Sequence, residues 1–258
     1  MEERLLTAWL CFWLAVFGAV FGSFLDCAAS RWAAGDPRPF AGRSRCASCG
    51  HTLGARDLVP VFSFLLLRGR CRFCGASIPA GCLWAELAGA AGFVCLGWRF
   101  GPCLELGQWL VLAVFLLALS LTDAAKRVIP DKLLFLLAAN RAVWFLVLGH
   151  GARELLAAVT ACAVPAALLA LVLGMEKLLG REVMGGGDLK LLFVLALYLT
   201  WAELLLALLA GCILGLLWAA LTGGKKGTAM PFGPFLAAGA MLTICFGKPV
   251  LEWYFGLF

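Results

Sequence analysis

The sequence predicts an all-α protein, a polytopic membrane helix bundle of about eight transmembrane helices, with a small cytoplasmic insert between the first two. Composition is the first observation behind this prediction. Of the 258 residues, 63% are hydrophobic and 14% are charged, and the mean hydropathy is +0.97. A single soluble core cannot bury so much apolar surface. The second observation is a series of apolar runs close to the roughly 20 residues that a helix needs to cross a bilayer.

Eight apolar segments are the candidate spans. They cover residues 5 to 25, 82 to 98, 105 to 122, 133 to 149, 155 to 173, 189 to 200, 202 to 221 and 232 to 247. We expect the first to be a retained span rather than a cleaved signal, because the preceding MEER has no net positive charge. The sixth is short, so its helix is expected to begin inside the preceding glycine stretch or to be locally broken.

Arginines orient the predicted bundle. The polar insert carries eight of them against two or three acids: Arg31, Arg38, Arg43, Arg45, Arg56, Arg68, Arg70 and Arg72. Loops rich in Lys and Arg stay in the cytoplasm, so the insert is expected there and the N-terminus outside. Eight crossings then bring the other basic clusters to the same side: Lys126, Arg127, Lys132, Lys177, Arg181, Lys190, Lys225 and Lys226. Because orientation explains the net charge of +6, we expect membrane lipid and no nucleic acid as a partner.

Three parts follow from this pattern. Residues 1–25 form the first transmembrane helix, residues 26–81 form a cytoplasmic Cys-rich insert, and residues 82–258 form the remaining transmembrane domain.

Four cysteines of the insert have the spacing of a metal site. Cys46, Cys49, Cys71 and Cys74 read C-x2-C-x21-C-x2-C, which presents four thiolates to one tetrahedral ion. Zinc in a closed, structural site is the preferred interpretation; the alternatives are two disulfides, which a reducing address disfavours, or four unliganded thiols. Gly50 and Gly75 follow the two pairs and suit tight turns that need positive φ.

An apolar stretch lies between the two cysteine pairs. Its core, VFSFLLL, is too short to span a membrane. It therefore either lies in the membrane interface or packs under the metal turns.

Two aspartates, Asp123 and Asp188, fall at the cytoplasmic ends of the third and sixth spans in this topology. Each could simply end a helix at the headgroups. Asp188, however, follows Gly185, Gly186 and Gly187, and each interior glycine weakens a helix by about 1 kcal/mol relative to alanine. Such glycines allow an extended peptide, or the helix carrying Asp123, to come close. Two neighbouring carboxylates cannot both ionise easily, so one protonated and one charged partner could hydrolyse a peptide with a shared water.

Four segments in order resemble one family. Asp123 lies in DAAKRVIPD (residues 123 to 131) and Asp188 in MGGGDLK (184 to 190), while FGSFLDCAASR (21 to 31) and PFGPFLAAG (231 to 239) also match. Together they resemble the GxGD aspartyl membrane proteases, and among these the type IV prepilin peptidases. Residues 82–258 would then be the peptidase domain.

The resemblance implies an enzyme of the bacterial inner membrane with its active site facing the cytoplasm. Asp123 and Asp188 would be catalytic, and Gly185, Gly186 and Gly187 would contact the substrate, a prepilin or pseudopilin with a basic leader and a hydrophobic helix. It also implies that residues 26–81 serve N-methylation of the new amino terminus with S-adenosylmethionine. Glu86 fits the family's acidic residue, either at that cofactor site or in a structural hydrogen bond. The departures, Asp26 where asparagine is common and PAGC (79 to 82) where R-Y-P is common, lie near this module.

Other functions stay open at this point. A non-methylating peptidase of the same class, a proton-coupled transporter with acids in its bundle, and a zinc-stabilised assembly factor without catalysis are the alternatives. A transporter would need a path to both faces, whereas these aspartates share one side. Arg141, beside Asn140 in the fourth span, either faces the bundle interior near an acid or shows that this span is misplaced.

Overall fold

The computed structural model describes residues 2–223 and 230–256, with side chains from residue 5 onward. Lys225 and Lys226, predicted at a cytoplasmic helix end, lie outside the described residues. The described part is helical and contains no β-strand; two isolated bridges, Arg45 with Thr52 and Arg70 with Ser77, occur in the insert. The chain divides into two compact units, Met1–Lys126 and Arg127–Phe258.

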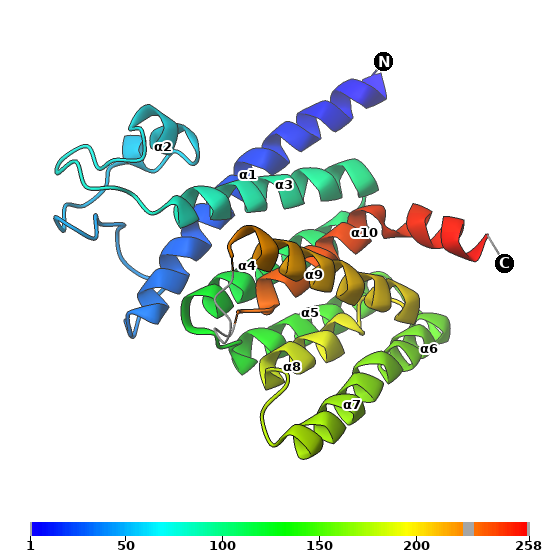
Figure 1. Ribbon diagram of the computed structural model, residues 1–258. Helices are drawn as coiled ribbons and strands as arrows, with labels where there is room; N and C mark the ends of the chain where they lie inside the picture. Colours follow the sequence, from blue (N-terminus) through cyan, green and yellow to red (C-terminus); the bar gives the residue numbers. More distant parts are fainter. Residues whose placement is uncertain (1, 224–229, 257–258) are drawn as a thin grey trace. The chain divides into compact units, whose positions relative to one another are not determined.

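The first unit contains three long helices and the insert. These are α1 (Glu2–Ala33), α3 (Ala80–Phe100) and α4 (Leu104–Lys126), with η1 (Ala55–Asp57) and α2 (Phe62–Leu66) between α1 and α3. Figure 1 shows α1 and α3 side by side, with the insert and α2 beyond the end of α3. The insert is therefore joined at both ends to long apolar helices.

Small residues bring α1 and α3 into backbone contact. A Cβ on Gly18 would collide with the backbone carbonyl of Gly89, and one on Gly22 with that of Ala85. Close approach of this kind is how helices pack in lipid, where no hydrophobic force drives them together. The backbones of α1 and α3 therefore contact each other directly.

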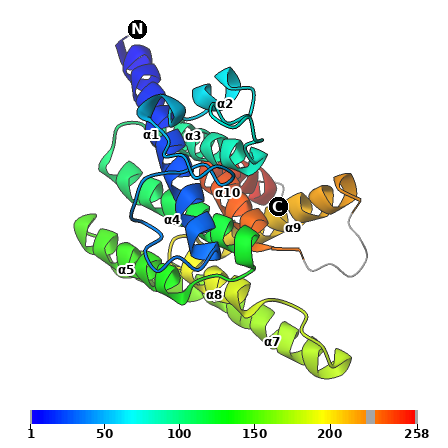
Figure 2. The ribbon, with the colours of Figure 1, turned by 90° about the vertical axis from the view of Figure 1, so that its left-hand side faces the viewer.

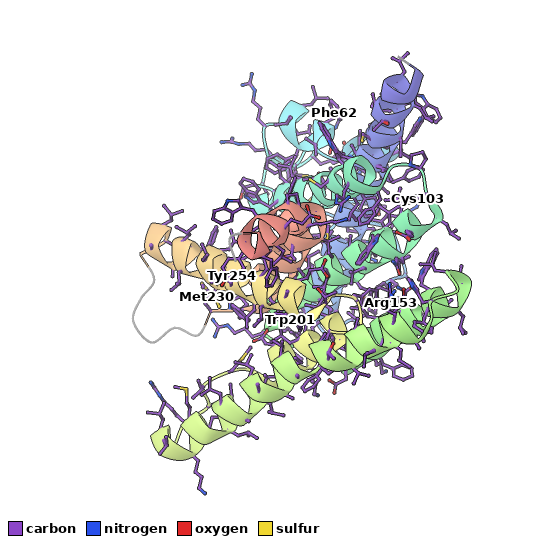
Figure 3. All side chains as sticks on the ribbon, turned by 90° about the vertical axis from the view of Figure 1, so that its right-hand side faces the viewer. Phe62, Cys103, Arg153, Trp201, Met230 and Tyr254 are labelled. Atoms are coloured by element: carbon purple, nitrogen blue, oxygen red, sulfur yellow. The ribbon has the colours of Figure 1, made fainter. Side chains whose placement is uncertain are left out.

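The second unit contains the remaining helices. They are α5 (Asp131–Val147), α6 (Ala152–Ala161), α7 (Ala163–Leu179), α8 (Gly186–Leu195), α9 (Trp201–Leu221) and α10 (Gly233–Phe255). Helices α9 and α10 pack antiparallel, since ring contacts join Trp201 to Phe255 at 6.2 Å and Trp218 to Phe235 at 6.4 Å. Figure 3 shows the labelled Trp201 and Tyr254 at the same end of this pair.

The predicted spans correspond to these helices with two differences. Six helices of the described part are long and apolar enough to cross a membrane: α1, α3, α4, α6 with α7, α9 and α10. The other two predicted spans are α5, with 17 residues, and α8, with 10. The prediction that the sixth helix begins inside the glycine stretch is confirmed, since α8 starts at Gly186.

The fifth predicted span is two helices that meet at Cys162. Pro165 explains the break, because it has no N–H to bond the carbonyl of Ala161. The chain continues from there with the Ala166 N–H bonded to the Cys162 carbonyl at 3.2 Å.

Polar side chains of α5 hold the segment that follows α8. Arg141 Nε donates to the Leu197 carbonyl at 2.8 Å, and its guanidinium lies 5.4 Å from the Tyr198 ring centroid. Asn140 Nδ2 donates to Tyr198 Oη at 2.9 Å, and that hydroxyl donates to the Leu137 carbonyl at 2.8 Å. Figure 2 shows α5 beside α8. Arg141 therefore lies within helix α5, as predicted. Its guanidinium is accommodated by a backbone carbonyl and an aromatic ring.

Candidate active site and metal centre

Asp123 lies in the last turn of α4 and is 6% exposed. Its neighbour Thr122 bonds back to the carbonyls of Ala118 and Leu119, both at 3.0 Å, so the hydroxyl is satisfied within the helix. The helix ends at Lys126, whose ammonium lies 4.8 Å from the Trp32 ring centroid of α1. A buried carboxylate at this position costs free energy unless its surroundings are polar, which is typical of functional acids in membrane proteins.

Asp188 lies in the first turn of α8, where Gly185 is the N-cap in an extended conformation. Its N–H donates to the Gly185 carbonyl at 3.1 Å. A Cβ on Gly185 would lie 3.2 Å from Asp188 Oδ2, so the carboxylate folds back over the glycine. The positive end of the helix dipole favours a negative charge here.

The three glycines differ in what surrounds them. A Cβ on Gly187 would lie 3.0 Å from Ile129 Cβ, so this glycine allows residue 129 to pack on α8. A Cβ on Gly186 would meet no described atom within 4 Å. Gly187 therefore allows Ile129 to come close, and Gly186 leaves space beside the helix start, while approach of a peptide or of the Asp123 helix stays a prediction.

Asp123 belongs to the first compact unit and Asp188 to the second. Their pairing, and the contact of the glycines with a substrate, stay predictions.

The four cysteines of the insert converge. Their Sγ atoms all lie within 4.8 Å of one another, and Cys46 Sγ is 3.8 Å from Cys74 Sγ. An ideal tetrahedron with metal–sulfur bonds of about 2.3 Å has sulfur atoms about 3.8 Å apart. The cluster therefore has the donors and spacing for one metal ion. Gly50 and Gly75 both have φ +71°, which confirms the predicted turns.

Backbone N–H groups make the cluster thiols unequal. Hydrogen bonds from the N–H groups of Cys49 and Ser48 lower the pKa of Cys46 from 9.0 to about 6. At Cys74 the Ala76 N–H acts in the same direction, but desolvation and the neighbouring cysteine side chains outweigh it and raise the pKa to about 11. Cys46 is thus more readily available as a thiolate ligand than Cys74.

A pocket of about 300 Å³ adjoins this cluster, between the insert and the cytoplasmic ends of α1 and α3 as the topology predicts them. We call it the acidic pocket, because Asp26, Asp57 and Glu86 line it. Arg45 and Arg72 also line it, and Arg72 Nε pairs with Asp57 Oδ1 at 2.9 Å. Glu86 is 8% exposed and accepts the Val61 N–H at 2.6 Å. Six serines add hydroxyls to the polar lining: Ser23, Ser30, Ser44, Ser48, Ser63 and Ser77. Glu86 therefore makes the structural hydrogen bond and also faces a cavity.

Two features of these regions escaped the sequence reasoning. Arg31 donates to backbone carbonyls of the insert, and Lys190 Nζ pairs with Asp131 Oδ1 at 2.7 Å. Arg31 was counted only as a loop charge. Lys190 and Asp131 are the last residues of the two aspartate motifs. Their opposite charges near the starts of two helices are the sequence feature that could have indicated an ion pair.

Two family models match the chain. The model of the Bacterial Peptidase A24 N-terminal domain matches residues 16–100, and that of the Type IV leader peptidase family matches residues 110–220. The prepilin leader peptidase/N-methyltransferase of Dichelobacter nodosus is 36% identical over 219 residues, which are 83% of this chain and 74% of that protein. The chain belongs to the type IV leader peptidase family.

Other members of the family extend the match. The prepilin leader peptidase/N-methyltransferase of Burkholderia pseudomallei (strain 1026b) is 40% identical over 80% of this chain and 68% of its own length. That of Bacillus subtilis (strain 168) is 32% identical over 93% of this chain and 96% of its own. No solved structure gives a significant match. Family membership and six apolar helices make this a multi-pass membrane protein, with both aspartates in the leader peptidase match and the cysteine cluster in the N-terminal one.

Proposed function

We propose that this protein is a membrane aspartyl endopeptidase that removes the leader of type IV prepilins or pseudopilins at the cytoplasmic face of the inner membrane. One observation carries the proposal: Asp123 and Asp188 are motif aspartates and both fall within the residues matched by the leader peptidase model. Membership of this family favours a peptidase over a proton-coupled transporter.

Asp123 and Asp188 would act as a pair that shares one proton. The charged carboxylate removes a proton from a water molecule, which attacks the scissile carbonyl, while the protonated partner donates a hydrogen bond to the carbonyl oxygen. The open face at Gly186 gives an extended substrate backbone room beside Asp188. The substrate's apolar helix stays in the lipid while its leader junction reaches the polar edge.

The experiment uses the full-length enzyme in detergent and a synthetic peptide that spans a leader junction. Mass spectrometry is expected to find one cut, directly before the apolar segment. Intact peptide, together with proton-dependent uptake of solute by vesicles that contain the enzyme, would support the transporter instead.

We also propose that the enzyme methylates the new amino terminus, and that the acidic pocket holds the methyl donor. S-Adenosylmethionine is a sulfonium cation with hydroxyl and amino groups, and the pocket offers six serine hydroxyls and three carboxylates, of which Asp57 pairs with Arg72. Its volume of about 300 Å³ is at the lower end of the range for small-molecule sites. When bound, this molecule supplies the methyl group; Asp26 and Glu86 hold its charge, and the Glu86 bond to Val61 keeps the pocket wall in place.

Zinc is the ion we propose for the cysteine cluster, because four thiolates in a tetrahedron with no position for water suit a structural zinc site. Metal analysis of the purified protein is expected to find one zinc ion per chain. Cys49→Ser should lose the ion, whereas Cys212→Ser, which changes an exposed cysteine of α9, should keep it. Equal zinc content in both variants would place the ion elsewhere.

A further inference from the structure

A second pocket adjoins the acidic pocket in the same unit. Its volume is about 230 Å³, and Val20, Phe24, Phe40 and Pro60 give it an apolar lining; we call it the apolar groove. Both pockets are lined by Ser23, Cys27, Ser44 and Leu58, which form a common wall. Cys27 Sγ and Ser44 Oγ lie 3.8 Å apart in that wall. Two cavities thus meet at one partition, and of the two only the acidic pocket has carboxylates in its lining.

We propose that the apolar groove binds the first side chain of the processed amino terminus, so that the amine reaches the methyl donor in the acidic pocket. This inference rests on the proposed methylation. Leader removal leaves a free amine on the first residue of an apolar helix. That residue therefore carries both an apolar side chain and an amino group, which is cationic when protonated and neutral when not. The groove matches the side chain, and the neighbouring carboxylates match the nitrogen.

Arg31 builds the groove. Its Nη1 donates to the Ala41 carbonyl at 2.7 Å and its Nη2 to the Arg43 carbonyl at 2.9 Å. These bonds hold the loop of residues 39–43 against the end of α1, where Phe40 meets Phe24 with ring centroids 6.3 Å apart. A guanidinium fork can bridge two carbonyls in this way, and a lysine ammonium has no such geometry. The groove is therefore a built feature of the insert rather than a gap beside it.

Helix α1 aligns the two pockets. Val20, Ser23, Phe24 and Cys27 lie three or four residues apart and so share one face of α1. Asp26, three residues after Ser23 on the same helix, lines the acidic pocket. Helix α1 thus contributes residues to both pockets within about one turn.

The transfer has a simple balance. The α-amino group loses its proton to water, as it does readily near its ordinary pKa of about 7.7 to 8.0. The nitrogen lone pair then forms a bond to the methyl carbon while the carbon–sulfur bond of the sulfonium breaks, and its electron pair remains on sulfur. The products are a methylammonium cation, which loses a proton to water to give the methylated amine, and a neutral thioether. The groove contributes orientation, because it fixes the residue that carries the nitrogen.

The test uses full-length enzyme in detergent with Phe24→Ala and Phe40→Ala. Acceptor peptides begin with phenylalanine, leucine or alanine, and methylation is followed by mass spectrometry. Loss of one aromatic contact is expected to raise KM for the phenylalanine acceptor about ten-fold and to reduce its preference over the alanine acceptor. Phe40→Leu, which keeps the apolar bulk, should recover most of this loss. Binding of S-adenosylhomocysteine, measured by calorimetry, should stay within about two-fold in all three variants.

Phe62→Ala is the matched control. Phe62 is 68% exposed on α2 and does not line the groove, so methylation and leader cleavage should be unchanged. Unchanged acceptor KM and selectivity in both groove variants would overturn the inference, as would an equal loss of S-adenosylhomocysteine binding, which would assign the two residues to the donor pocket. A wild-type enzyme that cleaves leaders but transfers no methyl group would overturn the methylation proposal itself.

Discussion

At the scale of single residues, a hydroxyl and a guanidinium stabilise the segment that follows the Asp188 helix. Tyr198 Oη accepts from Asn140 and donates to the Leu137 carbonyl, and Arg141 donates to the Leu197 carbonyl. Because Tyr198 is 7% exposed, water cannot replace these bonds. A buried polar group left without its partner costs about 1–3 kcal/mol.

Tyr198→Phe is therefore expected to lower the melting temperature in detergent by several degrees, since about 1 kcal/mol shifts a protein of this size by roughly 2–4 °C. The chain has two tyrosines, and the other provides the control. Tyr254 is 50% exposed near the end of α10, where water can replace a bond of its hydroxyl, so Tyr254→Phe should lower the melting temperature less than Tyr198→Phe does. Equal shifts for the two variants would mean that the Tyr198 bonds do not stabilise the fold.

At the scale of helices, the α1–α3 contact depends on the absence of side chains. Gly18→Ala would drive a methyl group into the backbone of α3 at Gly89, and such overpacking costs about 1–3 kcal/mol. Gly174→Ala in α7 is the matched change, because its Cβ would meet no described atom within 4 Å and alanine favours a helix by about 1 kcal/mol. Thermal unfolding should show Gly18→Ala destabilised and Gly174→Ala neutral or slightly stabilised. The reverse order would be incompatible with close packing of α1 on α3.

An ion pair joins the first turns of helices α5 and α8. Lys190, two residues after Asp188, pairs with Asp131, the first residue of α5, and both side chains are largely exposed. An exposed pair contributes about 0.2–1 kcal/mol, so its expected effect is on the placement of α8 more than on stability.

Lys190→Asp puts two carboxylates together and is expected to lower kcat of leader cleavage several-fold. The swapped double variant, with Asp131→Lys added, restores the attraction and should recover most of kcat. A steady-state comparison of the two single variants, the double variant and the wild type measures this coupling. If the double variant is no better than the worse single variant, the ion pair does not position the helix.

Local signals predicted part of this architecture well. The C-x-x-C turns are set by a few adjacent residues, so the spacing was enough to expect four converging thiols, which the structure brings within 4.8 Å. The break between α6 and α7 also had a local cause in Pro165, but the continuous apolar run concealed it. Other contacts join residues that are not adjacent in sequence. They are the Arg31 hydrogen bonds to the Ala41 and Arg43 carbonyls, the common wall of the two pockets, and the hydrogen bonds of Tyr198 to α5. No periodicity or spacing encodes such contacts, so only the structure could reveal them.

At the scale of the whole molecule, two compact units each carry half of the proposed chemistry. The first holds Asp123, the cysteine cluster and both pockets, and the second holds Asp188 on a helix too short to span a membrane. The proposed aspartate pair therefore draws on both units, whereas the proposed donor and acceptor pockets for methylation belong to the first alone.

The central claim is that Asp123 and Asp188 together hydrolyse the leader peptide bond, and cleavage by the two asparagine variants tests it most directly. Asp123→Asn and Asp188→Asn keep size and polarity but remove the ionisable group, so each is expected to lower kcat at least about a thousand-fold with unchanged helix content. Asp36→Asn, which changes an exposed aspartate of the insert, should cleave like wild type. Substantial cleavage by either catalytic variant, at more than a few per cent of the wild-type rate, would contradict the account.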